Sequence, residues 1–231
     1  MSFAFADLLY EQIEISQTDA AVDPSNLTEY TFSGKSLGAA HSNRKILVAV
    51  GSGNANTGRT IDTLTIAGTS ATLVSDGVTS ARADGGGGAG NTTTTEIWIA
   101  SLSAGTSGDI VVTWSAGMSR CSIVVYRLIN AQTTAYNVAT DISITANALT
   151  ASVNQIGFGV VIGSIYDVDA ATRTHTWDVL TEDVDQEVEA GRAHSTASMR
   201  TGFSQSAVSH TVTASDTIAT AGLIVVSFKP L

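Results

Sequence analysis

The chain has 231 residues, of which 43% are hydrophobic and only 14% are charged, so a sizeable core and a largely neutral surface are expected. The 21 acidic residues outnumber 11 lysines and arginines, and the net charge of −10 argues against nucleic acid as a partner. The single cysteine, Cys121, excludes an intramolecular disulfide and a thiolate metal cage.

Short segments rich in Val, Ile, Thr, Trp and Tyr, bounded by Gly, Asn, Asp and Ser, recur along the chain and predict β-strands. The clearest span residues 45–50, 61–66, 95–100, 109–114, 120–128, 155–166, 173–180, 209–213 and 219–228. A helical period is not sustained anywhere, so a helix is expected only as a short piece over 4–11. The pattern predicts an all-β, antiparallel β-sandwich that is jelly-roll-like, with an immunoglobulin-like sandwich as the alternative.

Several of these segments are apolar at every position instead of alternating, namely 46–50, 123–126 and 223–226. Such strands are expected to be buried on both faces. Either a further layer of strands or a neighbouring subunit would provide the second covering face. The second option favours a homo-oligomer, with a trimer preferred over a monomer.

The segment 83–95 contains four consecutive glycines and is predicted to be a surface loop between two strands of the same sandwich. It does not fit a phosphate-binding loop, because no lysine and no helical pattern follow it. The segments 107–115 and 215–228 resemble each other only as generic strands. This likeness does not indicate an internal repeat.

No enzyme motif is evident in the sequence. The four histidines, at 41, 175, 194 and 210, are not spaced as metal ligands on one strand or one helical turn. A Gly-x-Ser-x-Gly nucleophile elbow is also missing. We therefore expect a non-enzymatic protein with no obligatory cofactor.

The densest acidic run spans 181–189, where an extended strand would place Asp183, Asp185, Glu187 and Glu189 on one face and two valines on the other. Such a strand has an ordinary solvated acidic face in most proteins. A calcium site is the alternative, because this hard cation prefers several carboxylate oxygens. The candidate metal ligands are Asp167, Asp169, Asp183 and Asp185.

Large aromatic side chains provide the candidate ligand-binding residues. Trp98 and Trp114 lie within predicted strands and are expected in the core. Trp177, between Thr176 and Asp178, is the best candidate for an exposed aromatic side chain. The predicted binding residues are Trp177, Asp178 and Tyr166.

The order of segments between Thr31 and Leu128 resembles a group of uncharacterised β-sandwich structural proteins of tailed bacteriophages, prophages and phage-like gene-transfer particles. The residues that carry the resemblance are 40–50, 59–68, 98–100, 105–113 and 119–127, with a looser continuation through 157–162. The resemblance marks a scaffold and transfers no active-site residue. It does not include residues 1–30.

The resemblance implies a virion component displayed on the particle exterior: a capsid decoration protein, a head spike, or a tail or baseplate adhesin. Its partners would be other virion proteins, its own copies and host cell-surface glycan. Residues 1–30 would be an N-terminal arm or docking segment, and residues 31–231 a single β-sandwich domain.

The first residues lack the basic region of a signal peptide, and no apolar run is long enough to span a membrane. The expected location is therefore the virion, after synthesis in the host cytoplasm and without membrane insertion. The alternative function is a free carbohydrate-binding module or lectin that uses calcium at the acidic loops.

Overall fold

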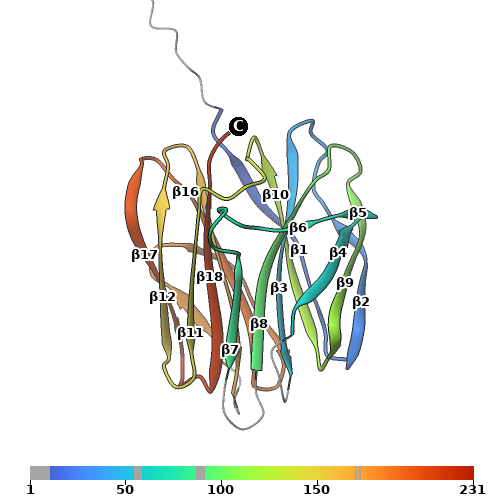
Figure 1. The fold of residues 1–231 in the computed structure, drawn as a ribbon, viewed down its shortest axis with the longest axis vertical. Helices are drawn as coiled ribbons and strands as arrows, with labels where there is room; N and C mark the ends of the chain where they lie inside the picture. Colours follow the sequence, from blue (N-terminus) through green and yellow to red (C-terminus); the bar gives the residue numbers. More distant parts are fainter. Residues whose placement is uncertain (1–10, 55–58, 87–91, 170, 172) are drawn as a thin grey trace, which may run out of the picture.

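The computed structural model describes residues 11–54, 59–86, 92–169, 171 and 173–231. These residues form eighteen β-strands and no helix, which confirms the predicted all-β antiparallel sandwich (Figure 1). The helix expected over 4–11 lies, apart from Glu11, outside the described residues. The described part of the chain therefore contains no helix that is long and apolar enough to cross a membrane.

The first half of the molecule, residues 11–129, contains two sheets. The inner sheet has the order β1-β10-β3-β8, with β6 and β7 both pairing with β8 at its edge. The outer sheet has the order β2-β9-β4-β5. The bounds are β1 Glu14–Asp23, β2 Leu27–Ser36, β3 Arg44–Asn54, β4 Ile61–Ile66, β5 Thr69–Ser70, β6 Thr72–Leu73, β7 Arg82–Gly86, β8 Thr92–Ser101, β9 Ser107–Met118 and β10 Cys121–Ile129.

The second half, residues 137–231, also contains two sheets. Its inner sheet has the order β11-β18-β13-β16-β15, and its outer sheet the order β12-β17-β14. The bounds are β11 Asn137–Ser143, β12 Ala148–Gln155, β13 Val160–Val168, β14 His175–Trp177, β15 Thr181–Glu189, β16 Arg192–Arg200, β17 Gln205–Ala214 and β18 Thr220–Phe228.

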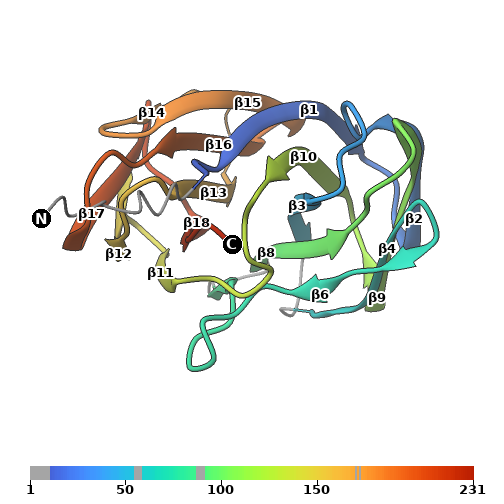
Figure 2. The same ribbon diagram turned by 90° about the horizontal axis from the view of Figure 1, so that it is seen from above.

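The four sheets form four layers, with the two inner sheets packed against each other (Figure 2). One hydrophobic core lies within each half, and a third core joins the inner sheets through residues such as Leu47, Tyr126, Ile162 and Val226. The continuously apolar segments in β3, β10 and β18 are therefore buried on both faces, as predicted, and the same is true of β13. The second covering face comes from the other half of the same chain, so these strands no longer argue for an oligomer.

The two halves repeat the same strand connections. The inner strands β1, β10, β3 and β8 correspond to β11, β18, β13 and β16, and the outer strands β2, β9 and β4 correspond to β12, β17 and β14. At the edge of the inner sheet, β15 pairs with β16 in the second half as β7 pairs with β8 in the first half. The internal repeat that the sequence did not indicate is thus present in the fold. The segments compared in the sequence, β9 and the region of β18, are not equivalent strands.

The contacts between the inner sheets are also paired. β3 packs against β13 at the centre, β7 and β8 pack against β11 and β18 on one side, and β1 and β10 pack against β15 on the other. The ends of β10 and β18 lie together, because Ala131 and Pro230 form a β-bridge. Equivalent turns of the two halves therefore lie at the same end of the molecule, as an approximate two-fold relation along the strands requires.

The predicted N-terminal arm is wrong for residues 11–30. β1 pairs with β10 along its whole length, from Glu14 opposite Ile129 to Asp23 opposite Cys121. Ile13 is fully buried, and β2 pairs with β9 in the outer sheet. These strands are integral to the first half, so the sandwich begins well before Thr31. Residues 1–10 lie outside the described part of the chain.

The glycine-rich segment is a strand where it is described. Gly85 and Gly86 belong to β7 and pair with Thr93 and Thr92 of β8. A Cβ atom at Gly85 would collide with the Thr93 side chain and lie 2.7 Å from the carbonyl oxygen of Ala221 in β18. Glycine at this position lets the two halves approach closely. Residues 87–91, the rest of the predicted loop, lie outside the described ranges.

Candidate functional site

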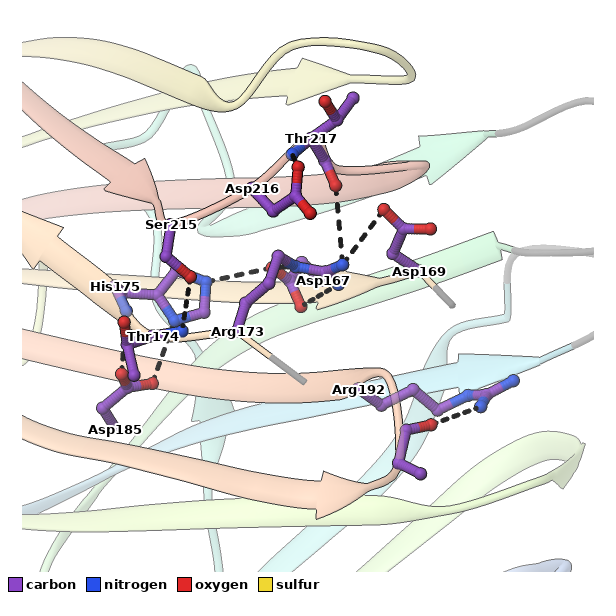
Figure 3. Close-up of polar contacts among 11 residues, drawn as sticks. Asp167, Asp169, Arg173, Thr174, His175, Asp185, Arg192, Ser215, Asp216 and Thr217 are labelled. Carbon is purple, nitrogen blue, oxygen red and sulfur yellow. Dashed lines mark hydrogen bonds and ion pairs between the residues drawn. The ribbon is translucent and has the colours of Figure 1, made fainter. Parts of the chain in front are cut away.

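The predicted metal ligands Asp167, Asp169 and Asp185 belong to a charged network in the second half (Figure 3). Asp167 is at the end of β13 and is fully buried. It accepts hydrogen bonds from Arg173 through both oxygens, with Nε and Nη2 each at 3.1 Å. Arg173 Nη1 lies 3.1 Å from Asp169 Oδ2. Arg173, which precedes β14, thus contacts both Asp167 at the end of β13 and Asp169 just after it.

His175 connects the network to β15. Its Nε2 lies 3.0 Å from Asp167 Oδ2, and its Nδ1 lies 2.9 Å from Asp185 Oδ1. Its backbone N–H also donates to Asp185 Oδ2, at 2.8 Å. Burial lowers the pKa of the imidazole, but the hydrogen bonds and charges of the two carboxylates outweigh burial and raise it to about 9. At neutral pH the ring is an imidazolium that donates from both nitrogens.

The same contacts act on Asp167. Burial raises its pKa, but the hydrogen bonds from His175 and Arg173 and their positive charges outweigh burial, so the net shift is downward. The carboxylate therefore stays ionised while shielded from solvent. Its two oxygens are already occupied by cationic donors, which is the condition under which a buried charge is tolerated.

This arrangement does not fit the proposed calcium site. A calcium ion would have to compete with Arg173 and His175 for the oxygens of Asp167. Among the described residues, no group of three or more His, Cys, Asp and Glu side chains is placed to hold a metal ion. Neither ring nitrogen of His175 is left to act as a base or as a metal ligand. The network holds together β13, β14 and β15.

Asp183 lies apart from the network. β15 contains a bulge between Glu182 and Val184, so the four acidic side chains do not share one face as predicted. Asp183 accepts a hydrogen bond from Tyr126 OH of the first half at 2.9 Å, whereas Asp185 contacts β14 on the other side of the sheet. Burial raises the pKa of Asp183.

The predicted ligand-binding residues are not on one surface. Trp177 was expected to be exposed, but it is 7% exposed and its ring covers Gly163 in the core. Its Nε1 donates to Ser195 Oγ at 2.9 Å. Tyr166 is fully buried against Gly51 between the two halves. Asp178 is exposed, but its Oδ1 accepts from the N–H groups of Val179 and Thr211.

A serine–histidine contact also occurs between the halves, and it is closed to substrates. His194 lies 2.6 Å from Ser122 Oγ and 3.0 Å from Ser164 Oγ, and all three residues are fully buried. Burial lowers the pKa of His194 to about 3, so the ring is neutral. This contact joins β10 to β13 and β16 across the inner sheets.

An open site lies at the end of the second half, at the marked C-terminus in Figure 1. We call it the tip pocket. Its volume is about 550 Å³, within the usual range for small-ligand sites. It is lined by the turn between β12 and β13, by the turn between β16 and β17, and by two further segments: Gln132, Ile156, Gly157, Phe158, Ser204, Lys229, Pro230 and Leu231.

Sequence reasoning missed the tip pocket because Phe158 was included in a predicted strand over 155–166. Phe158 is 52% exposed, and Phe203 on the adjacent turn is 81% exposed. The sequence does contain a signal, since Gly157 and Gly159 flank one phenylalanine and Gly202 precedes the other. Glycines around an aromatic residue favour a turn that presents the ring.

Comparisons of the chain with protein-family models, with curated proteins and with solved structures find no match. The assignment of a function therefore depends on the sequence pattern and on the geometry described above.

Proposed function

We propose that the protein is a non-enzymatic structural component displayed on the exterior of a bacteriophage or phage-like particle. The observation that carries the proposal is the doubled sandwich, in which buried charge is used to join sheets. Asp167, Arg173 and His175 bind one another and are closed to solvent. Such a design suits a protein that must persist outside a cell.

The strand order supports a jelly roll as the finer description of each half. In the first half, consecutive strands alternate between the inner and outer sheets from β1 to β4 and again from β8 to β10. An immunoglobulin-like sandwich instead pairs several consecutive strands as hairpins within one sheet. Jelly rolls are common in the capsid and lectin domains of viruses and other systems.

Phage or phage-like particles from a bacterial culture that produces the protein, purified on a density gradient, provide the test. We expect the protein to sediment with the particles, and an antibody against it to bind intact particles before any disruption. Protein that stays at the top of the gradient, or that becomes accessible only after disruption, would contradict exterior display. Light scattering of the isolated protein would give the number of copies that assemble.

A free carbohydrate-binding module is the second candidate, and the exposed aromatic side chains at the tip pocket favour it. The two functions differ in where the protein is found, because a free module would be recovered without particles. A thermal melt with calcium and with EDTA tests the metal-dependent form of this candidate. Because Arg173 and His175 occupy Asp167, we expect the same melting temperature in both conditions.

A further inference from the structure

We propose that the tip pocket binds an acidic oligosaccharide, with a sugar ring on Phe158 and an anionic substituent at Lys229. This inference rests on the proposed function, since it identifies the surface through which an exterior particle protein would contact host polysaccharide.

Phe158 is held in a conformation that is unfavourable for a phenylalanine. Its φ is 62°, in the left-handed region that L side chains rarely adopt. Hydrogen bonds fix both sides of the residue: its N–H donates to Thr201 O at 2.9 Å, and its carbonyl accepts from Ile13 N at 3.1 Å. Strain that the surrounding structure maintains at an exposed side chain indicates a functional role. Here the strain presents an aromatic ring to solvent.

The charge of the pocket differs from that of the whole molecule. The chain has a net charge of −10, whereas the described residues that line the pocket carry one positive charge, on the Lys229 side chain, and one negative charge, on the terminal carboxylate of Leu231. Lys229 forms no ion pair within the described part of the chain, whereas six of the other ten lysines and arginines do: Lys35, Arg82, Arg120, Arg127, Arg173 and Arg192. An anionic group that binds beside Lys229 would therefore meet this cation and no acidic side chain of the described lining residues.

The other polar groups in and beside the pocket are neutral. Ser204 Oγ accepts from Gly157 N at 3.0 Å and keeps its own proton to donate. A second depression of about 250 Å³ adjoins the pocket at Ser204 and is lined by amide, hydroxyl and phenol groups from Tyr136, Asn154, Gln155, Gln205 and Ser206. Aromatic faces for sugar C–H groups, next to neutral donors and acceptors for hydroxyls, suit a saccharide chain longer than one ring.

The equivalent end of the first half has a different design. The corresponding turns, 37–43 and 102–106, are joined by the buried guanidinium of Arg44. It donates to the carbonyl oxygens of Leu102 at 2.7 Å, Gly38 at 2.9 Å and Ala104 at 2.6 Å. Neither turn contains Phe, Tyr or Trp. The aromatic pocket is thus specific to the second half, although both halves have the same connections.

Calorimetry with the full chain tests the proposal. The probes are uronate-containing bacterial oligosaccharides and the same oligosaccharides after reduction of their carboxyl groups. We expect the acidic member of a pair to bind at least tenfold more tightly than its reduced counterpart. Phe158→Ala and Lys229→Gln should each weaken binding by at least tenfold, and Phe158→Tyr should retain it. Val78→Ala, at a 95% exposed apolar position in the first half, is the matched control and should bind as the wild type does.

Equal affinity for acidic and reduced probes, or unchanged binding by the Phe158→Ala variant, would overturn the inference. A change in oligomeric mass caused by Phe158→Ala or Phe203→Ala, without loss of glycan binding, would show that these side chains make contacts between copies of the protein. That result would also overturn the inference. Circular dichroism melts would identify variants that fail to fold. If Phe158→Ala does not fold, the comparison of Phe158→Tyr and Lys229→Gln with the wild type still tests the inference. If the protein is displayed on particles but binds no glycan, this inference alone is overturned. If the protein binds acidic glycan but is absent from particles, the proposed function alone is overturned.

Discussion

Each half of the molecule uses a carboxylate from its inner sheet to bind the first backbone amide of an outer strand. In the first half, Glu96 of β8 accepts from the N–H of Ile61, at 3.3 Å. In the second half, Asp185 of β15 accepts from the N–H of His175, at 2.8 Å. The repeated connections thus create the same need at the start of β4 and of β14. An acidic side chain meets it in both halves: Glu96, which is buried, and Asp185, which is 14% exposed.

The two halves neutralise this buried charge differently. Glu96 accepts from Trp98 Nε1 at 2.7 Å, and Arg82 Nε lies 3.6 Å away. Burial dominates there and raises the pKa of Glu96 to about 7. In the second half, His175 carries a proton between Asp185 and Asp167. One fold thus accommodates these carboxylates in two ways: burial raises the pKa of Glu96 to about 7, whereas Asp167 is paired with the cations Arg173 and His175.

The largest expected effect comes from removing the charge of Asp167. Asp167→Asn would leave Arg173 and His175 as buried cations with one partner fewer, so we expect a loss of about 3–5 kcal/mol in the free energy of unfolding at pH 7. Glu96→Gln is the counterpart in the first half. It should cost less, about 1–3 kcal/mol, because the amide keeps one acceptor oxygen for either Ile61 N–H or Trp98 Nε1–H and places its NH2 group against the other donor.

Urea denaturation at pH 7 measures both differences. Asp62→Asn, at an exposed position of β4, is the control and should change stability by less than about 0.5 kcal/mol. Equal losses for Asp167→Asn and Glu96→Gln would show that the halves do not differ in how they neutralise charge.

The pH dependence of stability separates the halves next. The folded state raises the pKa of His175 from 6.5 to about 9, so it holds this proton more tightly than the unfolded chain does. The resulting stabilisation is fully present below pH 6.5 and is lost as pH rises through 9, with a total of about 3 kcal/mol. Urea midpoints should fall between pH 7 and 9.5 in the wild type. His175→Gln should be less stable at pH 7 and should lack this decline.

Glu96 acts in a lower pH window. Its folded-state pKa of about 7 lies above the ordinary value of 4.5, so its contribution is lost as pH rises from about 4.5 to 7. His194 acts in the opposite direction. Its ring stays neutral in the folded protein but gains a proton in the unfolded chain, so the free energy of unfolding decreases as pH falls from 6.5 towards 3. The difference between the wild type and Glu96→Gln isolates the glutamate. We expect the variant to gain in relative stability from pH 5 to 7, and a constant difference would contradict this.

Packing provides a smaller test in the second half. A Cβ atom at Gly163 in β13 would lie 2.5 Å from Trp177 Cζ3 and 2.9 Å from Leu180 Cδ1. We expect Gly163→Ala to cost about 1–3 kcal/mol, because the tryptophan must leave its position. Gly202→Ala is the control, since nothing lies within 4 Å of the added atom. Near-ultraviolet circular dichroism should report the displaced indole only in the first variant.

The sequence predicted the fold class because strand patterns are local. β4 was predicted over its observed length, and the central strands β3, β10 and β18 were recognised by their apolar runs. The doubled architecture was not predictable in this way. The two halves share connections but not residues: Arg44 joins turns in one half, and the corresponding turns form a pocket in the other.

The candidate sites show the same limit. Asp167 and Asp185 were recognised as candidate acidic ligands, but their cationic partners Arg173 and His175 are brought to them only by the tertiary structure, which places β14 beside the ends of β13 and β15. Trp177 was placed on the surface because polar residues flank it. In a three-residue strand such as β14, the residue next to Trp177 points to the opposite face, so its polarity does not indicate whether Trp177 is buried. The space that the indole fills is left by Gly163 of β13, which is distant in the sequence.

The smallest expected effect concerns the surface contact between the halves. Arg120, in the turn before β10, lies 2.8 Å from Glu189 at the end of β15. Glu189 is largely exposed, so solvent screens this pair, and Glu189→Gln should cost less than about 1 kcal/mol at low salt and nothing measurable in 1 M NaCl. Urea denaturation at both salt concentrations measures the difference. A larger loss at low salt that disappears in 1 M NaCl would mean that surface charge holds the halves together. A small loss assigns that role to the apolar core between the inner sheets, where Leu47, Tyr126 and Val226 are fully buried.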